Sequence, residues 1–378
     1  MAEQLLEENE LHGQGLRAAR TLVPLKKLKP GFLHYLFANA EVRALYPGQV
    51  LFDANAYDQT HVYLLHGRVE LQYSDGRREL VSGGTMDFPL AHETPRSCSA
   101  VARTDCSVLS VDSAQLDRIL SWSQIAECLM ADIAVERDYD EDNDWMQTVL
   151  DSNLFFKVPP VNVEKIFARL TPVVVFEGEV VIRQGEIGDC CYFIKEGTAS
   201  VTRYVEPSEA HGHGGVQSVA EIGVGRCFGE DALVYRTARN ANVTMTSDGV
   251  LMRLEKNDFL VLLKEPEVNE LSREAVETGT AVLIDVRTEE EYSAGHLEPS
   301  ANIPLNLLSL KKRLLSADKP YVLYCDTGRR SKAAAYLLGR EGYNIAALEG
   351  GLRRGGVMND LSQRQKYILR DGELVASQ

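Results

Sequence analysis

The stretch that decides the fold is Phe228-Gly-Glu-Asp-Ala-Leu-Val-Tyr-Arg-Thr-Ala-Arg-Asn-Ala-Asn-Val243. Gly229 allows the backbone to approach a ligand closely, and residues 232–234 can begin a short helix whose free N–H groups bind an anion. The guanidinium of Arg239 suits paired phosphate oxygens, and the carboxylate of Glu230 suits a pair of hydroxyl groups. The stretch therefore predicts a pocket for a small sugar phosphate. The alternative is a surface hairpin in which Glu230 pairs with Arg239.

The same stretch resembles the phosphate-binding cassette of cyclic-nucleotide-binding domains, which usually runs Phe-Gly-Glu-x-Ala-Leu, a short spacer, then Pro-Arg-x-Ala. The resemblance implies that Glu230 binds the ribose 2′-hydroxyl and Arg239 the cyclic phosphate. The other site residues that it implies are Gly229, Asp231, Ala232 and Asn240. Ala238 replaces the common proline, and Asn240 stands where cAMP sites often have Ala and some cGMP sites have Thr. We expect cAMP, in preference to cGMP, as a regulatory ligand.

An internal repeat extends this prediction over the first 260 or so residues. From about Pro47, short apolar runs separated by turn residues are typical of an antiparallel β-roll. The segments Gly48–Gly67 and Gly178–Gly197 align without gaps, which indicates a tandem repeat. Residues 176–186 and 191–201 also resemble the cyclic-nucleotide-binding β-roll. The sequence thus predicts two such domains.

The two copies differ at the predicted pocket. The alignment puts Met86, Asp87 and Arg96 of the first copy opposite Gly229, Glu230 and Arg239 of the second. A side chain at Met86 and a carboxylate one methylene shorter at Asp87 should weaken a phosphate site. We therefore expect a structural or docking role for the first copy. Weak or altered ligand binding is the alternative.

The segments around the second copy have patterns of their own. Apolar residues at helical spacing predict a connecting helix from Ser113 to about Val135, followed by a solvated acidic turn, residues 138–144. Helical segments are expected around Leu154–Phe167 and from Asp258. The copies differ in length by an insertion assigned to residues 207–215, where His211 and His213 lie among glycines. A metal site needs more ligands than these two histidines, so we expect a mobile loop there.

Beyond Pro266, strands alternate with helices, which is typical of a parallel α/β sheet. Residues 281–285 and 321–324 are predicted strands, and residues 331–338 a helix. Cys325 directly follows the second of these strands, at the edge where open α/β sheets bind ligands. The loop amides and two arginines, Arg329 and Arg330, are expected to bind an anion and to lower the pKa of the Cys325 thiol.

This region resembles the rhodanese family of sulfurtransferases over about ninety residues. The resemblance rests on Leu-Ile-Asp-Val-Arg287, Glu291-Tyr292, Gly295-His-Leu297, Ala301-Asn-Ile-Pro304 and the loop Cys325-Asp-Thr-Gly-Arg-Arg330. It implies that Cys325 attacks thiosulfate or a persulfide, holds the sulfur as a persulfide, and passes it to a thiol or cyanide. Gly328 would allow the turn, and Arg330 with Arg329 would hold the anionic donor.

Two observations bear on that chemistry. Related phosphatases and arsenate reductases have a longer loop, so the six-residue loop favours sulfur transfer over phosphate hydrolysis. Gly355 stands where the family usually has a tryptophan after its paired glycines. The alternative is that Cys325 is a redox sensor or an inert relic.

Composition excludes several classes of protein. The formal charge of −15 disfavours nucleic acid and anionic lipid as partners, and no apolar run reaches the roughly 20 residues that cross a bilayer. The seven cysteines form no zinc-type pair, so we expect no metal and no disulfide scaffold. A cytoplasmic protein is expected, and a homodimer is left open.

The sequence predicts a multidomain protein of α+β and α/β class. The boundaries expected are a degenerate cyclic-nucleotide-binding-like domain at 1–135, a cyclic-nucleotide-binding domain at 136–265 and a rhodanese-like domain at 266–378. The hypothesis for function is a sulfurtransferase whose Cys325 persulfide is under allosteric control by the second domain. The alternative is a non-enzymatic nucleotide- and persulfide-sensing protein that controls a partner.

Overall fold

A computed structural model describes residues 13, 15–37, 40–136, 141–150, 158–206, 215–354 and 366–377. The chain forms two compact units. The first combines Met1–Cys128 with Glu267–Gln378, and the second is Leu129–Pro266. Two segments that are far apart in the sequence therefore build one unit.

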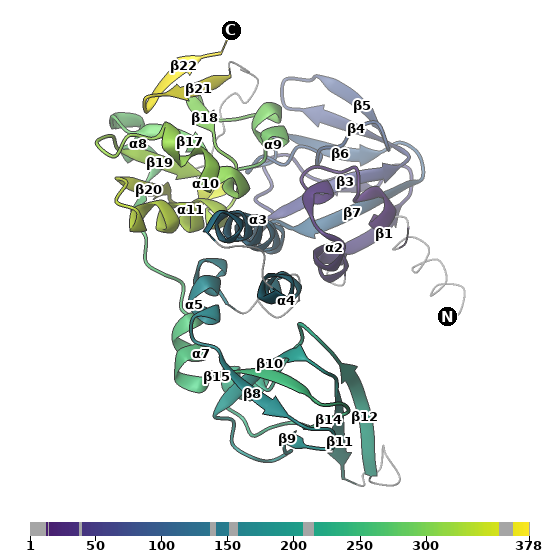
Figure 1. The fold of residues 1–378 in the computed structure, drawn as a ribbon. Helices are drawn as coiled ribbons and strands as arrows, with labels where there is room; N and C mark the ends of the chain where they lie inside the picture. Colours follow the sequence, from purple (N-terminus) through teal and green to yellow (C-terminus); the bar gives the residue numbers. More distant parts are fainter. Residues whose placement is uncertain are drawn as a thin grey trace. The chain divides into compact units, whose positions relative to one another are not determined.

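The first unit begins with an antiparallel β-roll of two facing sheets (Figure 1). Alternating side chains fill its interior, as in β4, where Val69 and Leu71 are buried and their neighbours are more exposed. The sheet orders are β1-β7-β3 and β2-β6-β4-β5. The elements are η1 (Leu25–Lys27), α2 (Pro30–Phe37), β1 (Glu41–Leu45), β2 (Val50–Phe52), β3 (Thr60–His66), β4 (Arg68–Tyr73), β5 (Arg78–Ser82), β6 (Cys98–Ala102) and β7 (Cys106–Asp112).

The second unit holds the other β-roll, with sheet orders β13-β10-β15-β8 and β12-β11-β14-β9. The predicted tandem repeat is therefore confirmed, but a short strand and a short helix, β13 and α6, are added in this copy. Its elements are α4 (Glu141–Leu150), η3 (Pro160–Asn162), α5 (Val163–Phe167), β8 (Thr171–Val175), β9 (Val180–Ile182), β10 (Cys190–Glu196), β11 (Ala199–Val205), β12 (Gly215–Ile222), β13 (Cys227–Phe228), α6 (Glu230–Val234), β14 (Asn242–Met245), β15 (Gly249–Glu255) and α7 (Lys256–Leu262).

The connecting helix is α3 (Ser113–Glu136), close to its predicted bounds. The division between the units falls within it, after Cys128. The prediction of a solvated acidic turn at 138–144 is wrong for residues 141–144, because these residues form the start of α4. Acidic residues favour a helix N-terminus, and Trp145 fixes α4 by donating from Nε1 to the Ile194 carbonyl oxygen at 2.9 Å.

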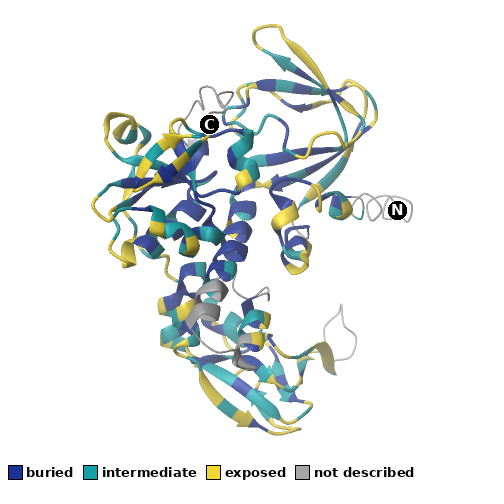
Figure 2. Ribbon diagram, turned by 45° about the horizontal axis from the view of Figure 1, so that its top comes forward, coloured by how far each residue is buried: buried dark blue, intermediate teal, exposed yellow. Residues whose placement is uncertain are grey.

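The remainder of the first unit is an α/β domain with a mostly parallel seven-stranded sheet of order β16-β20-β19-β17-β18-β21-β22. Every residue of β19, which lies between β20 and β17, is buried, as expected for a strand covered on both faces (Figure 2). Cys325 follows β19 directly, as predicted. The elements are β16 (Glu270–Leu271), α8 (Arg273–Thr278), β17 (Val282–Asp285), α9 (Glu289–Ala294), β18 (Ser300–Asn302), η4 (Leu305–Leu307), α10 (Leu308–Lys311), η5 (Lys312–Leu314), β19 (Tyr321–Tyr324), α11 (Arg329–Arg340), β20 (Ile345–Leu348), α12 (Gly351–Arg354), β21 (Tyr367–Arg370) and β22 (Glu373–Ala376).

Several predictions fall outside the described residues. They concern Leu154–Phe156, the loop with His211 and His213, and Gly355. Within the part of the chain that is described, no helix combines the length and apolar character needed to span a membrane.

Candidate functional site

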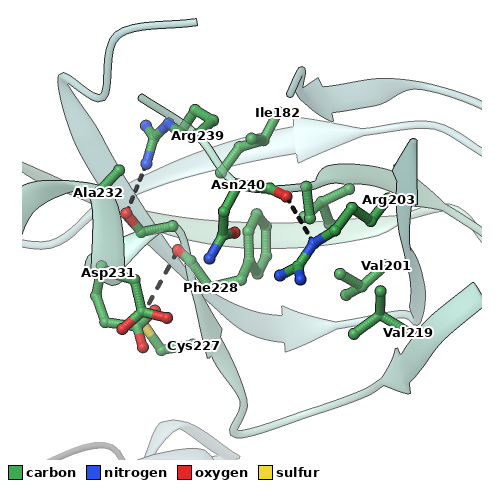
Figure 3. A pocket seen from close by; sticks show the side chains of 14 residues that line it. Ile182, Val201, Arg203, Val219, Cys227, Phe228, Asp231, Ala232, Arg239 and Asn240 are labelled. Carbon is green, nitrogen blue, oxygen red and sulfur yellow. Dashed lines mark hydrogen bonds between the residues drawn. The ribbon is translucent and has the colours of Figure 1, made fainter. Parts of the chain in front are cut away.

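A cavity of about 240 Å³ lies in the second β-roll and collects the residues predicted to bind a nucleotide (Figure 3). Its lining includes all six of them: Gly229, Glu230, Asp231, Ala232, Arg239 and Asn240. Strands β9, β11, β12 and β14 supply an apolar wall, on which Ile182, Val201 and Val219 lie. The cavity therefore combines charged groups with apolar surface, as ligand sites usually do.

Glycine is required at position 229 by its backbone and by its neighbours. Gly229 has φ +85° and precedes the first residue of α6. A Cβ there would lie 2.7 Å from Arg239 Nη1 and 2.7 Å from Ile182 Cδ1. Met86, its counterpart in the first copy, cannot fill this role in the same geometry.

Arg239 is held at the cavity by backbone carbonyl groups. Nη1 donates to the Gly229 oxygen at 2.6 Å, and Nη2 donates to the Cys190 oxygen at 2.7 Å. The side chain is only 5% exposed, which contradicts the surface-hairpin alternative. The nearby carboxylate of Asp189 lies 3.6 Å away and is 72% exposed. The guanidinium charge is thus buried and only weakly compensated by a carboxylate.

A second arginine, Arg203 on β11, lines the cavity and was not predicted from the sequence. Its Nε donates to the Asn240 carbonyl oxygen at 3.0 Å. Figure 3 shows Arg203 and Arg239 at opposite ends of the cavity, with Phe228 and Asn240 between them. No motif marks Arg203, because only the pairing of β11 with its neighbours brings it to this wall.

The corresponding arginine of the first β-roll, Arg96, has a different environment. It forms an ion pair with Asp58 and donates to the carbonyl oxygens of Leu90 (3.0 Å), Ala91 (2.9 Å) and Thr60 (2.8 Å). Residues 83–97, all of which are described, contain no helix corresponding to α6. The first β-roll thus neutralises its own arginine, and its structural or docking role stays a prediction.

The loop after β19 surrounds the Cys325 sulfur. The Gly328 N–H donates to Cys325 Sγ at 3.1 Å, and α11 begins at the next residue. Gly328 has φ +90°, which glycine adopts readily. Gly351 packs against the loop, since a Cβ on it would lie 2.5 Å from both the Cys325 oxygen and the Gly328 nitrogen.

The expectation of a lowered thiol pKa is wrong for this structure. Cys325 is 0% exposed, and its Sγ lies 3.3 Å from a carboxylate oxygen of Asp117, a residue of α3. Burial, and after it the negative charge of Asp117, raises the pKa of the Cys325 thiol to about 12, although Arg330 acts in the opposite direction. The loop geometry was predicted correctly, but the residue that α3 adds was not.

Arg330 lies between two carboxylates. Nε donates to Asp117, while Nη1 and Nη2 each donate to Glu291 at 2.8 Å. Glu291 also caps α9 by accepting from the Thr288 N–H. Burial raises the pKa of Glu291, but the charge and hydrogen bonds of Arg330 together with Arg287 and the Thr288 N–H outweigh it and lower the pKa to about 2. The positive charge of Arg330 is therefore fully paired within the unit.

A second polar cluster holds the other side of the loop. Arg353 Nε donates to Asp326 at 2.7 Å, and His61 Nε2 of the first β-roll lies 3.8 Å from the same carboxylate. Burial tends to raise the pKa of Asp326, but Arg353 and then His61 bring it well below its ordinary value. Arg353 also donates to Thr94 at 3.3 Å.

The structure thus brings Cys325, Gly328 and Arg330 together, with Arg329 as the first residue of α11. Their catalytic roles stay predictions. Sequence reasoning missed Asp117, although a signal existed. Between Ser113 and Ala126 the helix carries only two charged residues, Asp117 and Arg118. A helix so poor in charge is buried on most sides, so a carboxylate within it needs a buried partner.

Two family models match this chain. The Rhodanese-like domain matches residues 267–354, and the Cyclic nucleotide-binding domain matches residues 42–122 and 172–265. The second model thus covers both β-rolls.

Three relatives each match a part of the chain. The uncharacterized protein YqhL of Bacillus subtilis is 42% identical over 77 residues, which are 20% of this chain and 61% of that protein. The cAMP-dependent protein kinase regulatory subunit of Dictyostelium discoideum is 28% identical over 182 residues, 48% of this chain and 50% of its own length. A sulfurtransferase of Allochromatium vinosum is 30% identical over 93 residues, 24% of this chain and 86% of its own length.

The chain therefore spans less than two thirds of the first two relatives and most of the third. The two nucleotide-binding matches coincide with the two β-rolls, and the rhodanese match contains the Cys325 loop. This chain consists of two cyclic nucleotide-binding domains followed by a C-terminal rhodanese-like domain, and through that domain it belongs to the rhodanese family.

Proposed function

We propose that this protein is a sulfurtransferase regulated by a cyclic nucleotide. The observation that carries the proposal is the arrangement around Cys325, whose sulfur accepts a hydrogen bond from the Gly328 N–H just before α11. The same chain has a cavity lined by Glu230 and Arg239. The domain boundaries at residues 135 and 265 belong to this proposal.

The nucleotide site uses charge that the protein leaves poorly compensated. Arg239 binds the cyclic phosphate, because a buried guanidinium beside neutral carbonyl groups gains an ion pair from an anion. Glu230 accepts from the ribose 2′-hydroxyl, and the Asp231 and Ala232 amides at the start of α6 complete the site. Asn240 contacts the remainder of the ligand. We expect cAMP to bind in preference to cGMP.

The sulfur chemistry takes place in two steps, formation of a Cys325 persulfide and transfer of its outer sulfur. The Cys325 thiolate attacks the outer sulfur of thiosulfate, the S–S bond of the donor breaks, and sulfite leaves with the electron pair. A thiolate or cyanide then attacks the outer sulfur of the Cys325 persulfide, which regenerates the Cys325 thiolate. The Gly328 amide stabilises the bound sulfur, and Arg329 and Arg330 contribute positive charge to the loop.

The test is a thiosulfate:cyanide sulfurtransferase assay with and without cAMP and cGMP. An allosteric coupling of about 1–3 kcal/mol predicts a change of roughly 5- to 150-fold in the rate. Cys325→Ser is the control for chemistry and Arg239→Ala the control for regulation. If neither nucleotide changes the rate, the proposed regulation is disproved. If the protein shows no turnover and mass spectrometry detects no Cys325 persulfide, the proposed sulfurtransferase activity is disproved.

The burial of Cys325 favours a second candidate, a non-enzymatic protein that senses nucleotide and persulfide and controls a partner. A thiol with a pKa near 12 is almost fully protonated at neutral pH and reacts slowly. This candidate predicts that Cys325 forms a persulfide once per chain without useful turnover. Single-turnover and steady-state measurements on the same preparation separate the two functions.

A further inference from the structure

Helix α3 inserts a carboxylate into the Cys325 loop. We propose that Asp117 is an intramolecular inhibitor: it occupies the position of an anionic sulfur donor, and the loop accepts a donor only after Asp117 withdraws. This inference rests on the proposed function and adds the regulation of its sulfur site. It is argued from three observations within the first unit and a fourth on the helix that continues into the second unit.

The first observation is the set of contacts that Asp117 makes. Its Oδ2 accepts from the Thr327 hydroxyl, from the Thr327 N–H at 3.4 Å and from Cys325 Sγ at 3.3 Å, while Oδ1 accepts from Arg330 Nε. These are a backbone amide, a hydroxyl and a guanidinium, which are donors suited to an oxyanion. A donor anion directed at Cys325 would need the same groups.

The second observation is that Asp117 blocks access to Cys325 and neutralises the charge of Arg330. Its side chain is 2% exposed, Arg330 is 1% exposed, and Cys325 is fully buried. Glu291 already engages the other end of the Arg330 guanidinium. With Asp117 also bound, Arg330 has two carboxylate partners, and a second anion brought to the loop would be repelled.

The third observation is that several of the contacts around the loop are polar. The first β-roll meets the loop through His61 near Asp326 and Thr94 on Arg353, and α3 adds a bond from Asn306 Nδ2 to Glu127 Oε2 at 3.0 Å. Water can replace each of these partners when the surfaces part, because every group is able to form hydrogen bonds with solvent. Such contacts suit an arrangement that opens.

The fourth observation is the continuity of α3. The helix that carries Asp117 ends in the second unit, since the division between the units falls after Cys128. The second unit contains the cavity with Arg239. A change in α3 on nucleotide binding therefore has a covalent route to Asp117, and release of Asp117 is the event that it would cause.

The experiment measures the alkylation rate of Cys325 by iodoacetamide, with each cysteine followed by peptide mass spectrometry. The proteins are wild type, Asp117→Asn, Asp117→Ala and the matched control Arg118→Ala, which changes the exposed neighbour on the same helix. We expect Cys325 to react about 10-fold faster or more in both Asp117 variants, within the 5- to 150-fold range of typical couplings. Arg118→Ala should match wild type.

Cys98 serves as an internal reference because it is fully buried in the same unit as Cys325. A variant whose first unit merely unfolds would expose Cys98 together with Cys325, so acceleration counts only when Cys98 stays protected. The isosteric Asp117→Asn keeps the size of the side chain and leaves Arg330 paired with Glu291. Equal Cys325 rates in wild type and in folded Asp117→Asn would overturn the proposal.

The experiment also separates this inference from the proposed function, because alkylation needs no turnover. If Asp117→Asn is alkylated faster but no sulfur transfer is found, the inhibitory role of Asp117 is supported and the sulfurtransferase activity is disproved. If wild type transfers sulfur but the alkylation rates are equal, the sulfurtransferase activity is supported and the inhibitory role of Asp117 is disproved. Nucleotide added to wild type should accelerate alkylation if release of Asp117 is the regulated step.

Discussion

The two β-rolls share a strand plan but treat the corresponding arginine in opposite ways. In the first roll, Arg96 pairs with Asp58 and with three carbonyl groups of the same roll. In the second roll, Arg239 is bound by two carbonyl groups, and its nearest carboxylate, Asp189, is mostly exposed. The first roll needs no added anion, whereas the second gains from one.

The comparison teaches that a few local changes decide what one scaffold does. Gly229 and helix α6 create a cavity in the second roll, while the first roll has Met86 and no helix in that segment. The first roll instead contributes His61, Thr94 and the start of α3 to the surroundings of Cys325. One copy is suited to a ligand and the other to a neighbouring domain.

The largest expected effect is on stability, from Arg96→Ala. Breaking a buried ion pair typically costs about 3–5 kcal/mol, and we expect the lower end because Asp58 is 34% exposed. The free energy of unfolding, measured by denaturant titration of the first unit's transition, should fall by about 3 kcal/mol. Nucleotide affinity should stay unchanged, and a loss of affinity would show that the first roll also binds ligand.

The next effect is on affinity, from Arg239→Ala. Loss of a charged hydrogen-bonding group costs about 1.5–3 kcal/mol, so cyclic-nucleotide binding should weaken by roughly 10- to 150-fold. Calorimetry should give one site per chain in the wild type. Two equivalent sites per chain would contradict the proposal that only the second roll binds the nucleotide.

A pH profile tests how firmly α3 and the first roll cover the thiol. Because the Cys325 pKa is raised from 9.0 to about 12, its thiolate fraction should rise about tenfold per pH unit from pH 7 to pH 10. An unshifted thiol, with a pKa of 9.0, would be half ionised at pH 9 and would level off above that pH. The alkylation rate of Cys325 across this range is the measurement, and a slope that flattens from pH 9 upward would contradict the burial described above.

The smallest expected effect concerns Arg203. A guanidinium can donate two hydrogen bonds to the edge of guanine, and each such pair is worth about 1–3 kcal/mol of discrimination. Arg203 is exposed, so Arg203→Ala should weaken the binding of cGMP by only about 5-fold and the binding of cAMP by less. Competition titrations measure both, with the exposed Arg169→Ala as control. Equal losses for the two nucleotides would place Arg203 away from the base.

The nucleotide cavity was largely predictable because its charged residues lie in one short stretch. Gly229, Glu230 and Arg239 are close in sequence, so local turn geometry brings them together. Arg203 joins them only through strand pairing, which no local pattern reveals.

The Cys325 loop shows the limit of such reasoning. The strand, the glycine and the helix start followed from local rules, but the state of the thiol depends on Asp117, 208 positions earlier in the chain. The sequence does not say which helix covers a loop, and burial can reverse the sign of a pKa shift.

The first unit is discontinuous in sequence, and Leu129–Pro266 is in effect an insertion between its two halves. An excised C-terminal fragment would lack Asp117, His61 and Thr94 and would present a thiol loop without its native cover. Activity measured on that fragment would describe an uninhibited loop. Physiological control has to be studied on polypeptides that retain residues 1–128.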